Sequence, residues 1–381
     1  MMIKSKFMWW KMWYKGYFKH KIDLKPHSPS LGNREIQYLL MKPEHKKYIL
    51  KNLNKASIKQ IARELKLKER KIKKFLERQK KKPANSKKEA TGPRKRAVLL
   101  VSIALIIILG FVVYGNSLDG KFVWDDEALV KNNIYIKNWS SIANLFTKDV
   151  GMHIGADAGM KYNLYRPLQM LTYMCDYSFW KLNVTGCHLT NILLHIFTAL
   201  AIYWLINILF GNRSLSLLTS VLFLVHPIHT EAVSYISGRA DPLSLLLMLL
   251  SFIFYIKYLD RKKTSFYIPA LLSYGLALLS RENSLILPVL FLLYHYSFKK
   301  KLRISPSLPI IGISALYLLL RLKISAQLTS GDFISSTTTL FQRIPGFFAA
   351  ITEYIKLLLL PFNLHMEYGN KLFSFTDLRV L

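Results

Sequence analysis

The sequence is poor in acidic residues and has almost no cysteine. Its 381 residues include 22 Asp and Glu against 54 Lys and Arg, so the net charge is +32. In a soluble protein this imbalance would suggest nucleic-acid binding, but 30 of the basic residues and only seven acids lie before Ala97. The excess of positive charge is therefore concentrated in the segment before Ala97, which should lie on one side of a membrane. The two cysteines, Cys175 and Cys187, could form a disulfide or remain separate buried thiols.

Charge is absent from residues 97–118. At a rise of about 1.5 Å per residue, this stretch is long enough to cross a bilayer. It begins too late and is too long for the apolar core of a cleavable signal peptide. Half of the chain is apolar, and further apolar blocks follow. The sequence therefore predicts an all-α, polytopic transmembrane helix bundle in residues 97–381, preceded by a small basic helical segment.

Basic clusters such as Asp260-Arg-Lys-Lys263 alternate with polar motifs between the apolar blocks. The positive-inside rule then places the N-terminus in the cytoplasm, and a bacterial inner membrane is favoured over the endoplasmic reticulum. The last apolar run contains Glu353 and Lys356, so it is either an eighth span or an interfacial helix. The predicted spans are 98–115, 187–210, 215–225, 242–259, 266–279, 285–298 and 308–320, with 346–360 undecided.

The residues before the first span divide into three parts. Residues 1–40 form a basic, aromatic extension that need not be native, and residues 81–96 are predicted to be a flexible linker. Between them, residues 41–80 contain apolar positions at helical spacing, with Ser57 as N-cap, and resemble the first two helices of a helix-turn-helix. The basic residues there suit anionic lipid, and DNA binding is the less favoured alternative.

Three acids, Asp125, Asp126 and Glu127, follow the first span and are predicted to lie just beyond the outer surface. They could simply be solvated, or they could form an active site for a substrate delivered by the lipid. Adjacent side chains in an extended chain point to opposite faces, so Asp125 and Asp126 should have different tasks. One would be a general base or bind the acceptor, and the other would orient it or hold a divalent cation. The sequence establishes no cofactor or metal.

Further polar residues are predicted at the same surface. Acids that deprotonate a hydroxyl, together with arginines that hold a phosphate, suit group transfer from a phospholipid-linked donor. The alternative for each single residue is structural, because arginines at helix ends often snorkel to the interface. A stripe inside span 187–210 is either functional or holds helices together. The surface set is Arg166, His226, His229, Glu231, Arg239, Asp241, Arg281 and Glu282, and the stripe is His188, Asn191 and His195.

Seven of these motifs resemble, in order and spacing, the transmembrane and tetratricopeptide-repeat O-mannosyltransferase-like proteins, which are similar to GT-C glycosyltransferases. The resemblance covers about residues 98–368. It implies that Asp125 and Asp126 match the acidic motif of the first outer loop, and that Arg166 contacts the donor phosphate. The family's C-terminal repeats are absent, so the chain is expected to be C-terminally incomplete. The motifs are Phe122-Val-Trp-Asp-Asp126, Tyr165-Arg-Pro-Leu168, His188-Leu-Thr-Asn191, Val225-His-Pro-Ile-His-Thr-Glu-Ala-Val233, Gly238-Arg-Ala-Asp241, Leu279-Ser-Arg-Glu282 and Tyr354 to Tyr368.

The favoured function is therefore an integral membrane glycosyltransferase. It would transfer a mannose-like sugar from a polyprenyl-phosphate donor to a Ser or Thr hydroxyl of a protein at the outer face, with Arg166, Arg239 and Arg281 holding the phosphate. The alternative is a transporter or a scaffold that binds lipid-linked sugar without chemistry. Transporters often contain paired repeats, and no second copy of the motifs occurs here, so the alternative is less favoured.

Overall fold

The computed structural model describes residues 45, 48–49, 52, 56–65, 67–81, 93–148, 164–301, 304–326, 340–362, 364 and 373. The chain forms two compact units, residues 1–92 and 93–381. The predicted extension at residues 1–40 lies outside the described part. Helix α6 (Pro93–Tyr114) begins inside the predicted linker, so the last four residues of that segment are helical.

The N-terminal unit contains two short amphipathic helices, α4 (Ile58–Glu64) and α5 (Glu69–Lys81). Ser57 caps α4 as the sequence predicts. Its Oγ accepts from the Gln60 backbone N–H, and the Gln60 side chain accepts from the Ser57 backbone N–H, which completes a capping box. The apolar faces meet in a small core of Ile49, Ile61, Ala62 and Ile72.

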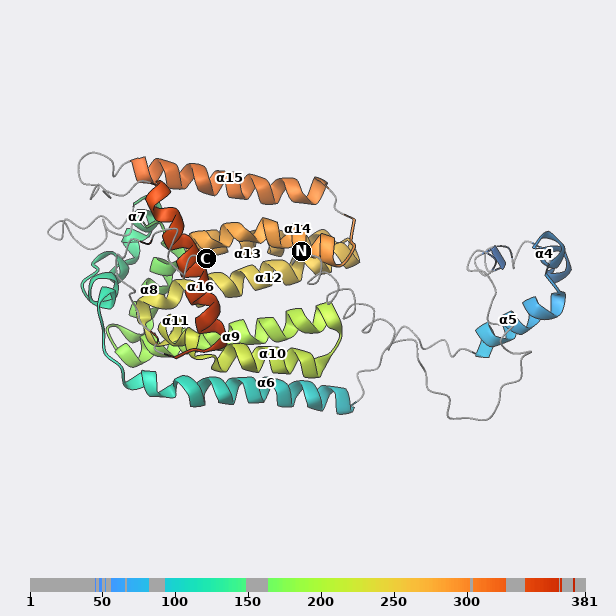
Figure 1. The fold of residues 1–381 in the computed structure, drawn as a ribbon, viewed down its shortest axis with the longest axis horizontal. Coiled ribbons are helices and arrows are strands. Elements are labelled where there is room, and N and C mark those ends of the chain that lie inside the picture. Colours follow the sequence, from blue (N-terminus) through green and yellow to red (C-terminus); the bar gives the residue numbers. More distant parts are fainter. Residues whose placement is uncertain are drawn as a thin grey trace. The chain divides into compact units, whose positions relative to one another are not determined.

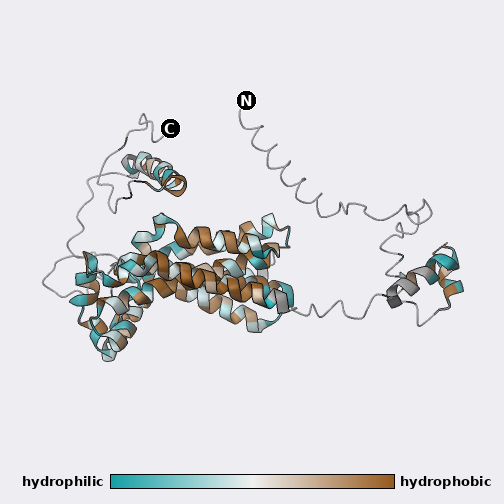
Figure 2. Cartoon of the chain, turned by 90° about the horizontal axis from the view of Figure 1, so that it is seen from below, coloured by the Kyte–Doolittle hydropathy of each residue, from teal (hydrophilic) through white to brown (hydrophobic). Residues whose placement is uncertain are grey.

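In the second unit, long apolar helices lie alongside one another (Figure 1), and Figure 2 shows that apolar residues run along their length. No strand occurs among the described residues, so the predicted all-α bundle is confirmed. Four helices are long and apolar enough to cross a membrane, at 96–119, 184–210, 236–261 and 305–324. A bent pair at 213–225 and 227–234 could form a fifth span. The helices are α6, α9 (Val184–Phe210), α10 (Arg213–Val225), α12 (Ala240–Arg261), α13 (Thr264–Ser280), α14 (Leu287–Ser297) and α15 (Ile304–Ala326).

Short elements gather at one end of this bundle, where α7, α8 and α11 are seen in Figure 1. We call this the loop end; it comprises residues 115–148, 164–183, 226–239 and 281–286. Residues 136–146 have apolar residues at helical spacing but form separate short elements, because the Asn138 side chain accepts from the Ser140 backbone N–H and starts a new turn. The elements are η1 (Gly115–Asp119), η2 (Glu127–Lys131), η3 (Tyr135–Lys137), η4 (Trp139–Ser141), α7 (Ile142–Thr147), α8 (Pro167–Trp180), η7 (Pro227–His229), α11 (Thr230–Ser234), η8 (Ile236–Arg239) and η9 (Glu282–Ile286).

Helix α16 (Leu340–Leu359) crosses the direction of the bundle helices instead of running parallel to them (Figure 1). It carries an exposed ion pair between Lys356 and Glu353, with 3.1 Å between Nζ and Oε2. A ring nitrogen of His226 lies 3.1 Å from the Leu358 carbonyl oxygen, which ties α16 to the loop end. This arrangement favours the interfacial helix over an eighth span.

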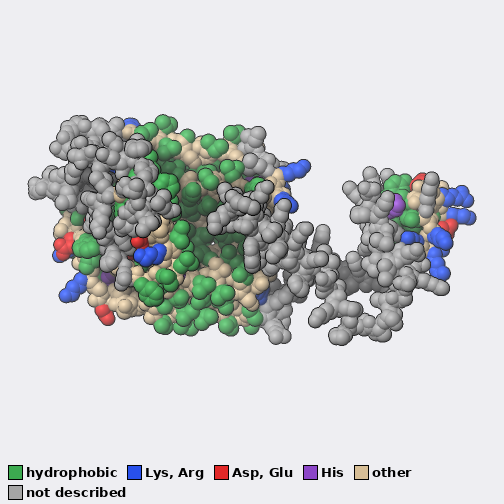
Figure 3. All heavy atoms as spheres, in the orientation of Figure 1, with side chains coloured by type: hydrophobic (Ala, Val, Ile, Leu, Met, Phe, Trp, Pro, Cys, Tyr) green, Lys and Arg blue, Asp and Glu red, His purple; other side chains and the backbone are tan. Residues whose placement is uncertain are grey.

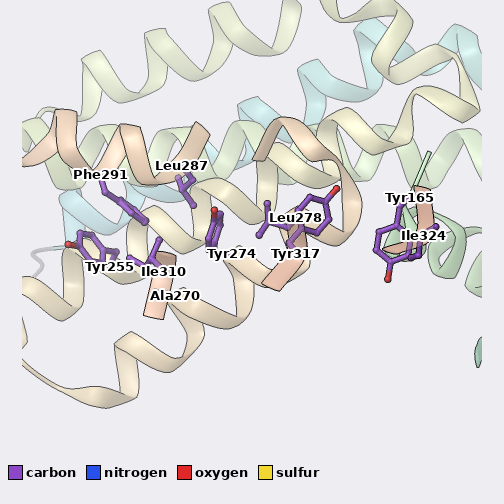
Figure 4. Close-up of a cluster of buried hydrophobic side chains, with 10 residues drawn as sticks. All are labelled: Tyr165, Tyr255, Ala270, Tyr274, Leu278, Leu287, Phe291, Ile310, Tyr317 and Ile324. Atoms are coloured by element: carbon purple, nitrogen blue, oxygen red, sulfur yellow. The ribbon is translucent and has the colours of Figure 1, made fainter. Parts of the chain in front are cut away.

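A buried cluster joins α12, α13, α14 and α15 and extends to Tyr165, just before α8 (Figure 4). Inside an apolar bundle, polar groups need partners. The Tyr274 hydroxyl lies 2.6 Å from Ser314 Oγ, and the Tyr255 hydroxyl lies 2.9 Å from His295 Nε2. The rings of Tyr165 and Tyr317 are 6.4 Å apart. The cluster therefore fixes the position of the next residue, Arg166, relative to α15.

Gly238 is required by a close approach of two backbones. A Cβ atom at this position would lie 2.7 Å from the carbonyl oxygen of Glu231, which is part of the backbone and cannot easily move. We expect Gly238→Ala to destabilise the protein by about 1–3 kcal/mol, measured as thermal unfolding in detergent. Gly275→Ala is the matched control, because nothing lies within 4 Å of its Cβ position. Equal unfolding midpoints for the two variants would contradict the close approach.

Candidate functional site

Asp126 ties the acidic turn to the segment before α12. It is fully buried, and its Oδ1 accepts from the Ser237 backbone N–H at 2.8 Å and from Ser237 Oγ at 2.6 Å. Its Oδ2 accepts from the Val123 N–H at 3.2 Å. Burial raises the pKa of Asp126, and the hydrogen bonds from Ser237 and Val123 oppose that rise. The carboxylate thus holds the two segments together.

Asp125 and Glu127 are exposed on either side of this buried carboxylate. The Asp125 backbone N–H donates to the Tyr235 hydroxyl at 3.2 Å, so its main chain is fixed while its carboxylate faces outward. The Glu127 carboxylate forms an ion pair with Lys131, with 3.0 Å between Oε1 and Nζ. Trp124 has a φ of 49°, which is rare for a bulky residue and sets the direction of the turn. Asp125 and Asp126 therefore occupy different environments, but they lie in a helical turn and not in the extended chain that the alternation assumes, and their tasks stay predictions.

A charged cluster lies at the loop end of α8, α12, α13 and α15. Arg166 donates to Glu282 at 3.1 and 3.3 Å, and Arg321 Nη1 lies 3.6 Å from the same carboxylate. Beside them, Arg281 forms an ion pair with Asp241. Burial would raise the pKa of Glu282, but the hydrogen bond and charge of Arg166, with Arg321, lower it. Three guanidinium groups thus face two carboxylates.

We call Arg166, Asp241, Arg281, Glu282 and Arg321 the outer charged cluster. Its formal charge is +1, so one anionic group could complete it. Each side chain remains partly exposed, from 15% for Arg166 to 45% for Asp241. Nε of Arg281 makes no hydrogen bond within the described part of the structure. The cluster thus combines excess positive charge with partial exposure, which are the properties that binding of an anion requires.

Arg239 is buried and its guanidinium is engaged inside the protein. Nε donates to Asn191 Oδ1 at 2.6 Å, and Nη2 donates to the Cys187 carbonyl oxygen at 3.0 Å. Nη2 also lies 2.5 Å from Asp176 Oδ2, and the guanidinium stacks on Tyr173. Its exposed fraction is 0%. This geometry does not support the expectation that Arg239 holds a donor phosphate, and it makes the residue a structural centre for α8, α9 and η8.

The polar stripe of α9 serves helix packing. The Asn191 amide donates to the backbone carbonyls of Val233 and Tyr235, at 3.2 and 3.0 Å. His195 Nε2 lies 3.1 Å from the Leu224 carbonyl oxygen. His188 is buried against Gly120, and neither ring nitrogen has a hydrogen-bond partner in the described structure. Of the two alternatives for the stripe, helix–helix hydrogen bonding therefore describes Asn191 and His195.

The remaining predicted site residues surround α11. The ring of His229 lies 5.3 Å from that of His195 and 6.1 Å from that of His226, while Glu231 lines a neighbouring cavity. Within the described ranges, no group of three His, Cys, Asp or Glu side chains has a geometry that could hold a metal ion. Cys175 and Cys187 are both free thiols.

A cavity of about 750 Å³ opens beside the acidic turn. Trp124 precedes Asp125 in the chain, the Tyr235 hydroxyl accepts from the Asp125 backbone N–H, and both aromatic residues line this cavity. Helix α16 supplies the opposite wall through Tyr354 and Leu357. The wall is mostly apolar, and Glu231 provides a carboxylate. The exposed carboxylate of Asp125 thus lies next to a space large enough for a polypeptide segment or a lipid chain.

The second unit is thus an all-α bundle with helices long and apolar enough to cross a membrane, and carboxylates and a cationic cluster lie at its loop end. Residues 179–323 match the family described as dolichyl-phosphate-mannose-protein mannosyltransferase. The resemblance to O-mannosyltransferase-like proteins that the motifs predict is therefore confirmed, and the family match covers residues 179–323.

Individual proteins that the chain resembles are likewise named as mannosyltransferases. The chain is 37% identical over 178 residues to the human protein O-mannosyl-transferase TMTC1, covering 45% of this chain and 20% of the relative. It is 31% identical over 160 residues to protein O-mannosyl-transferase F38B6.6 of Caenorhabditis elegans, covering 41% and 23%. It is 35% identical over 159 residues to tmtc2 of Xenopus laevis, covering 42% and 19%. The chain thus spans about a fifth of the length of these relatives.

The structure brings together some predicted site residues and adds others. Arg166, Asp241, Arg281 and Glu282 form one cluster, whereas Asp126 and Arg239 are internal. Arg321 and Asp176 were not predicted. Arg321 could have been predicted from the pattern that identified the other arginines, because it is a cation at the end of an apolar span. Asp176 had a weaker one, a lone acid within the apolar-periodic run of α8.

Proposed function

We propose that this chain carries the transferase site of an integral membrane glycosyltransferase. It would transfer a mannose-like sugar from a polyprenyl-phosphate donor to a Ser or Thr hydroxyl of a protein at the outer membrane face, with the N-terminus in the cytoplasm. The observation that carries the proposal is the position of Asp125, an exposed carboxylate on a turn that Asp126 fixes to the base of α12. The cavity lies beside this turn, and Ser237, which Asp126 holds, stands four residues before Asp241 of the outer charged cluster.

The reaction would be a single displacement with inversion at the sugar carbon. Asp125 accepts the proton of the acceptor hydroxyl, and the oxygen attacks the anomeric carbon. The bond between that carbon and the phosphate oxygen breaks, and polyprenyl phosphate leaves with the electron pair. The growing charge on the phosphate is balanced by Arg166, Arg281 and Arg321. Asp126 acts as a positioning residue, because its oxygens accept hydrogen bonds from Ser237 and Val123.

The cavity beside Asp125 would receive the acceptor. Relatives are named protein O-mannosyl-transferases, so a polypeptide is the acceptor class to test first. Trp124 and Tyr354 offer aromatic surfaces for apolar side chains on either side of the reacting hydroxyl.

The direct test uses radiolabelled polyprenyl-phosphate mannose, and a panel of other prenyl-linked sugars, with membranes that contain the protein and an acceptor peptide rich in Ser and Thr. Label in the peptide with one donor supports the transferase. Saturable donor binding without transfer in any combination would instead support the non-catalytic transporter or scaffold.

Weaker donor binding is expected when the outer charged cluster loses a cation. Arg281→Gln or Arg321→Gln should raise the KM for the donor by about 10- to 100-fold, because each removes a charged hydrogen-bond donor worth about 1.5–3 kcal/mol. Lys356→Gln is the control, since this lysine is exposed on α16 and pairs with Glu353. The comparison is made in steady-state transfer assays. Unchanged KM in both arginine variants would remove the cluster from the donor site.

A further inference from the structure

The N-terminal unit carries a basic surface on two packed helices. Lys59 and Arg63 are exposed four residues apart on α4, and Arg70 and Lys73 are exposed three residues apart on α5. Such spacings place side chains on the same face of a helix. Figure 3 shows Lys and Arg side chains gathered along this unit. We call Lys59, Arg63, Arg70 and Lys73 the basic face.

The core of the unit directs these side chains outward. Ile61 and Ala62 of α4 and Ile72 of α5 are buried against one another, with Ile49 completing the core. The nearby carboxylate of Glu64 accepts a hydrogen bond from the Tyr48 hydroxyl at 2.8 Å. The cations are therefore presented by folded helices, and are not only a run of charge in the sequence.

The chain keeps this unit close to a membrane. Residues 82–92 separate α5 from α6, and eleven residues reach at most about 40 Å when fully extended. Because α6 is a candidate span, the C-terminal end of α5 stays within about that distance of the start of α6, and the basic face is tethered near the bilayer. Tethering of this kind gives a weak contact a high effective concentration.

We propose that the basic face of α4 and α5 binds the anionic headgroups of the membrane in which α6 is embedded. Basic side chains near an anionic leaflet are attracted to it, and the attraction is screened by salt. Nucleic acid is less suited to this surface. In a helix-turn-helix the start of the second helix approaches the DNA, and α5 begins with the carboxylate of Glu69. Membrane binding by α4 and α5 is independent of the proposed transfer reaction.

The test is amide hydrogen exchange of the full chain in lipid nanodiscs, followed by mass spectrometry of peptides from α4 and α5. Discs of phosphatidylcholine are compared with discs that contain about 30% phosphatidylglycerol. Exchange in these peptides should slow by about threefold or more in the anionic discs, and should return to the neutral-disc rate in about 0.5 M NaCl.

Two variants with equal charge change separate the basic face from net charge. Lys59→Gln/Arg63→Gln/Arg70→Gln/Lys73→Gln should abolish the lipid dependence while keeping the wild-type exchange in neutral discs. Lys131→Gln/Lys137→Gln/Lys148→Gln/Lys181→Gln, at the loop end, should retain it. Should the first variant fail to fold, reversal by salt in the wild type still decides the question.

Equal exchange of the wild type in neutral and anionic discs would overturn the proposal. So would protection by a DNA duplex in neutral discs without any effect of phosphatidylglycerol, because the basic face would then be a nucleic-acid surface.

Discussion

Replacing Asp125 by Asn is expected to reduce sugar transfer by about 10²- to 10⁴-fold, the usual contribution of a general base. The amide is isosteric with the carboxylate but cannot accept the proton of the acceptor hydroxyl. The side chain is exposed, and it is the backbone N–H of Asp125 that contacts Tyr235, so the thermal unfolding midpoint should not change. Transfer is measured with saturating donor and acceptor in membranes.

Asp126→Asn is the informative comparison. An amide nitrogen in place of Oδ1 or Oδ2 would face the N–H groups and hydroxyl that now donate to the carboxylate, so one buried donor loses its acceptor. We expect a loss of about 1–3 kcal/mol in unfolding free energy, with reduced transfer following from the displaced turn. Wild-type transfer by a correctly inserted Asp125→Asn protein would exclude Asp125 as the base.

Replacing Arg239 by Met is expected to be among the most destabilising single changes in the bundle, at about 3–5 kcal/mol. The substitution leaves the buried carboxylate of Asp176 without its cation and Asn191 Oδ1 without its donor. Burial already raises the pKa of Asp176, and the charge of Arg239 opposes this rise. The measurement is thermal unfolding in detergent, together with the fraction of protein that inserts.

A rescue variant tests whether the buried pair is the cause. Arg239→Met/Asp176→Leu removes both charges and should recover part of the lost stability, because no ion then remains unpaired. Arg261→Met, at the opposite end of α12 and exposed, should shift the unfolding free energy by less than about 0.5 kcal/mol. If Arg239→Met unfolds at the wild-type temperature, the guanidinium does not organise the loop end.

The helices could be predicted from the sequence because a bilayer imposes length and apolarity. The predicted spans 187–210 and 215–225 correspond to α9 and α10. Side chains that hydrogen-bond to the backbone and interrupt a helix were harder to predict from the sequence. Asn138 interrupts the helical spacing of apolar residues at 136–146, because its side chain accepts from a backbone N–H two residues later. A capping interaction of this kind interrupts a helical pattern without changing its apolar spacing.

The charged residues of the site were harder to assign, because an arginine at a helix end looks the same in sequence whether it is buried or exposed. Arg239 forms an ion pair with Asp176, which lies 63 residues earlier in the chain. Only the packing of α8 on α9 brings the two side chains together. Arg321 likewise pairs with Glu282 only because helix packing brings the two side chains together. The outward direction of Asp125 could not be predicted from the sequence, because alternation applies to an extended chain and both acids lie in a helical turn.

The outer charged cluster also has an order of assembly. Its members come from α8, α12, the α13–η9 junction and α15, and α15 is synthesised last among them. During translation, the carboxylate of Glu282 therefore leaves the ribosome before Arg321 and is neutralised by Arg166 alone. A nascent chain interrupted before α15 would insert its earlier spans but lack the third cation. The full set of three cations is thus complete only after α15 has been made, so the charge of this end of the bundle changes during synthesis.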